Sequence, residues 1–197
     1  MGALNELLQT LPEEAKDLRL NLQSLLADGA LSREQRLGTA LACAYAVRSP
    51  QLARALLAEH SAEHSAGHSA GHSAEHSAEH SAGLSPAWQS DARAAAALMG
   101  MNNVFYRFRH LVGKESYASL PARLRMNRMA AVQTTKLDFE LMSLAVSAIG
   151  GCGVCVASHE RALIEGGLSD AQVLEAVRLA AVVQGLGTAL TMALAMD

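Results

Sequence analysis

Apolar residues recur at helical spacing along most of this chain, between strong helix-start and helix-stop signals. Ser32, Thr135 and Ser169 each precede such a segment, and their hydroxyl groups can accept hydrogen bonds from the first backbone amides of a helix. No segment shows the alternation of apolar and polar residues that marks a half-buried strand. The sequence therefore predicts an all-α fold. Helices are expected over residues 4–11, 12–22, 37–47, 92–112, 136–150, 152–166 and from 169 almost to the C-terminus.

The core must be built mainly from small and aliphatic side chains. Half of the 197 residues are hydrophobic but only 4% are aromatic, which suits closely packed helices in a single domain. Two uncharged stretches, 141–158 and 179–196, approach the length of a membrane span. Glycines and polar residues interrupt both, so we interpret them as buried helices in the core of an oligomer. The expected architecture is a single-domain, oligomeric helical bundle over residues 1–197.

Charge and the N-terminal sequence limit the location and the partners. The first twenty residues carry six charged side chains and no apolar segment, so we expect no secretory signal. Three cysteines in such a chain fit a reducing cytoplasm, where a CxxC pair is usually catalytic or metal-binding. A net charge of −3 gives no basic field for nucleic acid. We therefore expect a cytoplasmic protein without nucleic-acid or membrane partners.

A tetrapeptide repeat, x-His-Ser-Ala, occupies residues 59–83 and contains most of the histidines. They are His60, His64, His68, His72, His76 and His80. Four residues advance about 400° along a helix, so the imidazoles wind around the axis rather than share a face. Neighbouring imidazoles suit zinc, nickel or copper, but no cysteine or carboxylate pattern completes a site. We interpret the repeat as a low-complexity insertion in a surface loop.

The chemistry of the chain is concentrated in the segment 151–160, which contains Cys152, Cys155 and His159. A CxxC pair can close a small disulfide, supply half of a metal site or exchange thiols. In a helix the three side chains would project towards one side, with His159 one turn after Cys155. A proton acceptor would then lie beside a thiol, as an activated cysteine requires.

Glu140 is the carboxylate best placed to complete this group. It precedes the glycine pair 150–151, where an antiparallel hairpin would carry it close to His159. Glu140 would then orient His159, which takes the proton from Cys155. A helix N-terminus near Cys152 would instead favour a thiolate at that residue. The residues alone therefore leave the choice of nucleophile between Cys152 and Cys155 open.

A structural zinc site is the alternative use of the same residues. It would combine Cys152, Cys155 and His159 with Glu140, since a closed zinc site needs four ligands. The protein would then be a metal-binding protein, with the histidine repeat as a second metal-binding segment. The remaining cysteine, Cys43, lies in an apolar run and is expected in the core. Hydrolysis is not supported, because neither a Ser-His-Asp set nor a Gly-x-Ser-x-Gly motif is present.

Several motifs together resemble the alkyl hydroperoxidase D (AhpD) family of the carboxymuconolactone-decarboxylase-like superfamily. They are the segments 11–22, 99–107 and 137–149, the CxxC pair and the Ala-Ser-His-Glu of 157–160. CxxC by itself is weak evidence of family. The spacing of Glu140, Cys152, Cys155 and His159 with these flanking residues is specific. The resemblance covers nearly the whole chain except the histidine repeat.

The resemblance implies an all-helical homotrimer that acts as a lipoyl-dependent peroxidase of the EC 1.11.1 type. Such enzymes reduce organic hydroperoxides and regenerate a peroxiredoxin, alkyl hydroperoxide reductase C. Their electrons come from the dihydrolipoyl arm of a lipoylated 2-oxoacid dehydrogenase acyltransferase, which dihydrolipoamide dehydrogenase recharges. The dihydrolipoyl group is thus an electron-donating co-substrate, and neither a tightly bound cofactor nor a metal is expected.

The resemblance also implies a role for each residue of the site. Cys155 would be the peroxide-reactive thiol that becomes a sulfenic acid, and Cys152 the proton donor and resolving thiol of a redox disulfide. Glu140 and His159 would form the proton relay. Family members commonly carry a second histidine where this chain has Val154, so slower direct peroxidase activity is expected, with dithiol exchange less affected. A decarboxylase-like activity on a cyclic lactone is a further alternative, although that chemistry needs no dithiol.

Overall fold

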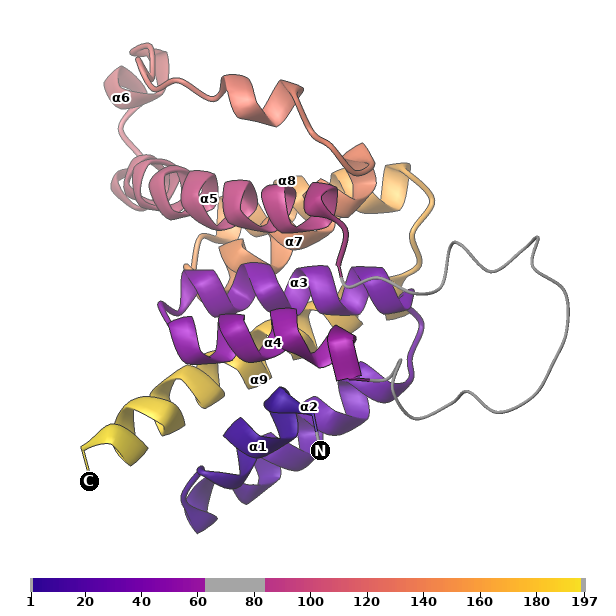
Figure 1. Ribbon diagram of the computed structural model, residues 1–197. Helices are drawn as coiled ribbons and strands as arrows, with labels where there is room; N and C mark the ends of the chain where they lie inside the picture. Colours follow the sequence, from indigo (N-terminus) through magenta and orange to yellow (C-terminus); the bar gives the residue numbers. More distant parts are fainter. Residues whose placement is uncertain (1, 63–83, 196–197) are drawn as a thin grey trace, which may run out of the picture.

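Helices make up the regular structure of the computed structural model, which describes residues 2–62 and 84–195 (Figure 1). In chain order they are α1 (Ala3–Gln9), the 3-10 helix η1 (Glu13–Ala15), α2 (Lys16–Ala27), α3 (Arg33–Ala46), α4 (Pro50–Ala62), α5 (Pro86–Val112), α6 (Glu115–Ser119), the 3-10 helix η3 (Asn127–Ala130), α7 (Lys136–Ile149), α8 (Gly153–Glu165) and α9 (Asp170–Leu194). No strand occurs among the described residues. The predicted all-α, single-domain fold is confirmed. The predicted insertion at 59–83 lies outside the described residues, except for residues 59–62 at the end of α4.

Three of the predicted helix starts are confirmed as capping boxes. Ser32, Thr135 and Ser169 each accept a hydrogen bond from the third residue of the following helix, whose side chain bonds back to the cap. The start of α5 was predicted at residue 92 but lies at Pro86. Ser85 caps this helix, and Pro86 occupies its first turn, where a missing N–H costs no hydrogen bond.

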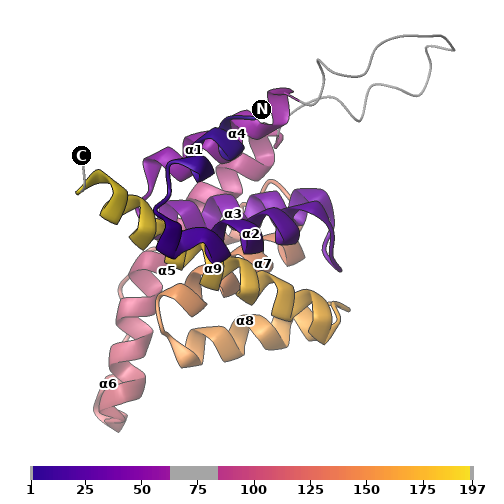
Figure 2. The same ribbon diagram turned by 90° about the horizontal axis from the view of Figure 1, so that it is seen from below.

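Helix α7 forms the centre of the core. It contacts α3, α5, α8 and α9, and residues 141–147 are all buried (Figure 2). The sequence interpretation assigned this apolar stretch to the core of an oligomer. The predicted burial of the helix is confirmed, and other helices of the same chain provide it along residues 141–147. The burial of Leu141, Met142 and Leu144 is therefore a property of one chain.

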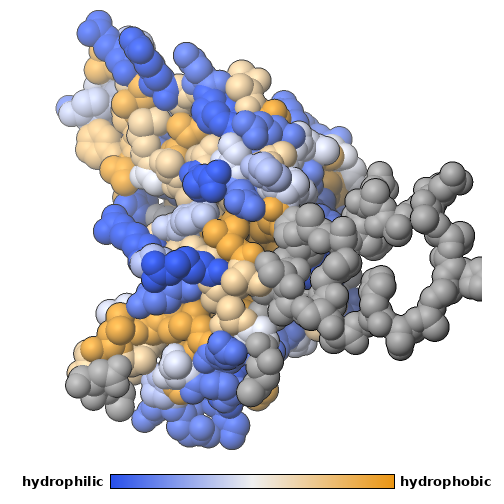
Figure 3. Space-filling model, viewed as in Figure 1, coloured by the Kyte–Doolittle hydropathy of each residue, from blue (hydrophilic) through white to orange (hydrophobic). Residues whose placement is uncertain are grey.

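Helix α9 is long and apolar enough, by length and composition, to cross a membrane, and it is the one such helix among the described residues. A core helix meets the same criteria. Leu179, Val183 and Leu186 of α9 are fully buried, and the helix contacts α2, α3 and α7. Its C-terminal end leaves Met192 and Leu194 exposed and contributes to the apolar surface at the lower left of Figure 3.

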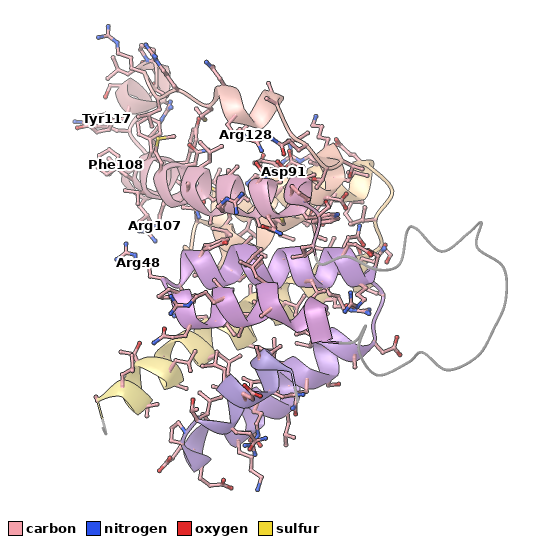
Figure 4. The ribbon with its side chains drawn as sticks, in the orientation of Figure 1. Arg48, Asp91, Arg107, Phe108, Tyr117 and Arg128 are labelled. Atoms are coloured by element: carbon pink, nitrogen blue, oxygen red, sulfur yellow. A yellow bond between two sulfur atoms is a disulfide. The ribbon has the colours of Figure 1, made fainter. Side chains whose placement is uncertain are left out.

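The segment 113–135 returns along α5 and is held there by Asp91 of α5 (Figure 4). The buried Asp91 carboxylate accepts hydrogen bonds from the backbone N–H of Gln133 at 2.9 Å and of Thr134 at 2.8 Å. The Thr134 hydroxyl and the Arg128 guanidinium also donate to it. Burial raises the pKa of Asp91, but these hydrogen bonds outweigh burial and hold that pKa below its ordinary value.

Three arginines of α5 and of the segment 113–135 donate hydrogen bonds to backbone carbonyls. Arg107 donates to the carbonyl of Gly150, Arg109 to that of Ala118 and Arg128 to that of Ala131. A guanidinium group donates in a fixed planar geometry, so each contact restrains the loop that it reaches. Arg109 thus fastens the segment 113–135 to α5 at a second point besides Asp91, whereas Arg107 reaches the turn after α7 and Arg128 acts within the segment.

We predict that Asp91→Asn lowers the free energy of unfolding by about 1–3 kcal/mol at pH 7, because Arg128 loses its charged partner. The folded pKa of Asp91 lies below the unfolded value of about 3.9, so the carboxylate stabilises the fold above that pH. Its contribution is lost as the pH falls through the folded pKa. Urea unfolding of wild type and variant should therefore show a difference that narrows below about pH 3.9.

The exposed Asp17→Asn exchange in α2 is the matched control and should change stability little. A difference between wild type and Asp91→Asn that stays constant from pH 7 to pH 3 would show that the charge of Asp91 does not hold the segment.

Candidate redox site

A two-glycine turn joins α7 to α8 and places the CxxC pair. Gly151 has a φ of 63°, in the left-handed region that side chains other than glycine rarely adopt. A Cβ atom on Gly150 would lie 2.5 Å from Nδ2 of Asn103, so that position has no room for a side chain. The turn ends at Cys152, which is the N-cap residue of α8. The two helices consequently run back along each other.

The two cysteines differ in exposure. A disulfide joins Cys152 to Cys155. The predicted position of Cys152 at a helix N-terminus is confirmed, since it is the N-cap residue directly before the first helical residue of α8. Cys152 is 0% exposed and Cys155 is 7% exposed. An external reagent therefore reaches the sulfur of Cys155 before that of Cys152.

Cys155 opens into a hollow of about 320 Å³ between α5, α8 and the segment 113–135. The lining residues are Met99, Asn102, Tyr106, Met126, Met129, Val154, Cys155, Ser158 and His159. Three of them are methionines, so the wall is mainly apolar and adaptable. The hollow thus brings a sulfur of the CxxC pair, an imidazole and an apolar surface together in one place.

Glu140 of α7 and His159 of α8 form an ion pair across the hairpin. Oε2 of Glu140 lies 2.6 Å from Nδ1 of His159, and both side chains are largely buried. The predicted approach of these two residues is confirmed. A hydrogen bond of this length orients the imidazole ring towards the carboxylate.

The second ring nitrogen of His159 also faces an acceptor. Nε2 lies 3.3 Å from the thioether sulfur of Met99. A carboxylate and a thioether only accept hydrogen bonds, so both ring nitrogens are placed to donate. The imidazole ring is therefore held in place at both of its nitrogens. Among the described residues, no hydrogen bond joins His159 to Cys155 while the disulfide is closed.

The ligand set of the alternative zinc site is not assembled in the described part of the chain. No group of three His, Cys, Asp or Glu side chains gathers there in a way that could hold a metal ion. Glu140 and His159 bond to each other, and the cysteine sulfurs are joined. Cys43 is fully buried in the core, and burial raises the pKa of its thiol. His64, His68, His72, His76 and His80 of the repeat lie outside the described residues.

Sequence reasoning did not assign the hollow-lining side chains of α5. Met99, Asn102 and Tyr106 follow one another at spacings of three and four residues, so they share a helix face. They belong to the segment 99–107 that carries the family resemblance, and this was the available signal. Met126 and Met129 had no such signal, because they reach the hollow only through the folding of the segment 113–135.

A wider hollow of about 660 Å³ lies against another face of α5. Arg48, Arg93 and Arg107 line it together with small apolar residues, and Figure 4 shows Arg48 and Arg107 on neighbouring elements. It contains neither cysteine nor histidine. Thiol chemistry therefore belongs to the smaller hollow at Cys155.

Comparison with known proteins matches nearly the whole chain. Alkyl hydroperoxide reductase AhpD of Anaeromyxobacter dehalogenans strain 2CP-C is 48% identical over 193 residues, which cover 98% of this chain and 93% of the relative. The protein of the same name from Bradyrhizobium sp. strain BTAi1 is 44% identical over 188 residues, 95% of this chain and 93% of the relative. The Carboxymuconolactone decarboxylase family model matches residues 115–197. This chain therefore belongs to the AhpD family of the carboxymuconolactone-decarboxylase-like superfamily.

Proposed function

We propose that this chain reduces alkyl hydroperoxides through the Cys152–Cys155 dithiol. One observation carries the proposal: Cys155 opens into the same hollow as His159, which is paired with Glu140. A nucleophilic sulfur, a proton source and an apolar surface are what the reduction of an alkyl hydroperoxide requires. The names of the relatives support this substrate class.

In the oxidative half-reaction, the Cys155 thiolate attacks the terminal oxygen of the hydroperoxide. The S–O bond forms, the O–O bond breaks, and the sulfur supplies the electron pair. The alkoxide leaves and takes a proton from His159, which gives an alcohol and a Cys155 sulfenic acid. Cys152 then attacks the Cys155 sulfur, and water leaves as the disulfide forms. The closed Cys152–Cys155 disulfide corresponds to the product of this step.

In the reductive half-reaction, a dihydrolipoyl group supplies two electrons and two protons. Because Cys152 is fully buried, the incoming thiolate would meet the Cys155 sulfur and form a mixed disulfide there. The second lipoyl thiol then closes the lipoyl disulfide and releases the dithiol. We propose a lipoylated acyltransferase, recharged by dihydrolipoamide dehydrogenase, as the donor. The reduced pair would in turn regenerate the peroxiredoxin alkyl hydroperoxide reductase C.

Val154 bears on the balance between these activities. It lies at the hollow with 41% of its surface exposed, and it cannot exchange protons. His159 is then the one imidazole among the residues lining the hollow. We therefore propose that dithiol exchange with the peroxiredoxin outpaces direct reduction of hydroperoxides in this protein.

Assembly into a homotrimer in the cytoplasm completes the proposal. The C-terminal half of α5 and the start of the segment that follows expose Val104 (61%), Phe108 (49%), Leu111 (76%) and Leu120 (59%). Such neighbouring apolar side chains are typical of surfaces that meet another protein, and they support an oligomer.

We predict that Cys155→Ser abolishes hydroperoxide-dependent oxidation of dihydrolipoamide, because serine cannot form the sulfenic acid. Cys152→Ser should reduce one equivalent of hydroperoxide and then stop, since the sulfenic acid has no thiol to resolve it. Coupled spectrophotometry and mass spectrometry after dimedone trapping measure both results. Cys43→Ala is the control and should turn over like wild type. Turnover in Cys155→Ser, or a sulfenic acid on Cys152, would contradict the assignment.

We predict that Glu140→Gln slows the oxidation of Cys155 by hydroperoxide about 100-fold, because a neutral amide does not stabilise the protonated His159 ring. The side chain keeps its size and an acceptor oxygen, so circular dichroism and the melting temperature should change little. Stopped-flow oxidation of the reduced protein gives the rate. Glu160→Gln, an exposed exchange next to His159, should keep the wild-type rate. A wild-type rate in Glu140→Gln would remove the relay from the mechanism.

A further inference from the structure

Two adjacent asparagines on α5 have different surroundings. Asn103 is bonded at both ends of its amide: Oδ1 accepts from the Ser147 hydroxyl at 2.9 Å, and Nδ2 donates to the Val146 carbonyl at 3.4 Å. These bonds attach α5 to α7, so Asn103 has a structural role. Asn102 is also buried, with 5% of its surface exposed, but it faces the hollow that contains Cys155 and His159.

The side-chain oxygen of Asn102 has no hydrogen-bond partner in the described part of the chain. Nδ2 of Asn102 lies 3.8 Å from the sulfur of Met129. A thioether can only accept a hydrogen bond, so the amide N–H belongs on that side and Oδ1 on the other. Oδ1 is buried and unpaired among the described residues. A buried carbonyl oxygen without a partner costs free energy, and such an exception calls for an explanation.

Oδ1 of Asn102 differs in its location from the other buried side-chain atoms that lack a hydrogen-bond partner. The described residues contain four further residues with a buried unpaired side-chain atom: Arg36, Thr39, Ser143 and Glu175. None of these four lines the hollow at Cys155. Among the described residues, Asn102 is therefore the one that both lines the hollow at Cys155 and carries a buried, unpaired acceptor.

We propose that Asn102 positions the substrate, with Oδ1 accepting the hydrogen bond of the terminal O–H of the hydroperoxide. The inference rests on the proposed function. A hydroperoxide has one O–H group, on the oxygen that the Cys155 thiolate attacks. Held by Oδ1, this oxygen faces the sulfur, while the second oxygen is left for the proton of His159. The methionines of the hollow then take the alkyl group.

The proton balance of the step is consistent with this arrangement. The proton held by Oδ1 stays on the oxygen that is transferred, and it becomes the S–O–H proton of the sulfenic acid. The alkoxide receives its proton from His159 instead. Asn102 thus keeps the same hydrogen bond from the bound substrate to the sulfenic acid, and no group has to exchange a proton with it.

The arrangement also distinguishes between electrophiles. Disulfides react with the Cys155 thiolate without offering an O–H group, so Asn102 has no part in that reaction. Loss of the acceptor should therefore slow the reaction with hydroperoxides and spare thiol–disulfide exchange at the same sulfur. A purely structural asparagine would affect both reactions alike.

The test compares the two reactions in Asn102→Leu, which keeps the side-chain size and lacks the acceptor. Stopped-flow oxidation of the reduced protein by cumene hydroperoxide should slow about 10- to 100-fold. Reaction of the same protein with 4,4′-dithiodipyridine, and reduction of its disulfide by dihydrolipoamide, should stay within about twofold of wild type. Asn102→Ser, which restores a polar oxygen, should recover part of the hydroperoxide rate. This variant is compared with wild type in the same two reactions if Asn102→Leu does not fold.

Asn103→Ala is the matched control: it should lower the melting temperature and leave the ratio of the two rates unchanged. A wild-type hydroperoxide rate in both Asn102 variants, or an equal loss in both reactions, would overturn the inference. If wild type itself does not react with cumene hydroperoxide, the proposed function fails instead, so the two failures are distinct.

Discussion

The hairpin of α7 and α8 is the constraint on which the site depends. Gly151 takes a backbone conformation closed to most residues, and Gly150 lies against Asn103 with no room for a side chain. The chain therefore reverses sharply, and Glu140 is carried back to His159 at 2.6 Å. Cys152, at the end of this turn, is fully buried, whereas Cys155 lines the hollow. One turn thus sets the ion pair and the unequal access to the two sulfurs.

The hollow itself depends on a second, remote restraint. Met126 and Met129 come from a segment with little regular structure, whose position is held by the buried carboxylate of Asp91. That carboxylate binds two backbone N–H groups just before α7 and pairs with Arg128 beside the methionines. Electrostatics at one end of α5 therefore shape the apolar wall in front of Cys155. The contacts that hold this segment therefore also set the shape of the hollow.

The sequence predicted helices best where their signals are local. A capping box needs only residues three positions apart, so Ser32, Thr135 and Ser169 could be recognised without the fold. The first turns of α5 were missed because Gln89, Ser90 and Asp91 show no apolar periodicity. Asp91 is buried there only because distant backbone groups satisfy its carboxylate. A polar residue with a distant partner looks like a loop residue in the sequence alone.

The sequence by itself determined the helical class and the capped starts of α3, α7 and α9, and it indicated four candidate site residues, because these follow from short-range spacing and from motifs. It also indicated that Glu140 would meet His159, since a hairpin at a glycine pair allows one such approach. Only the tertiary structure decided that Cys155 opens into the hollow and Cys152 does not. The tertiary structure also showed that Asn102 and its neighbour Asn103 differ in their hydrogen bonds. These distinctions depend on which side chains surround a residue in space, and residues far apart in the chain supply those neighbours.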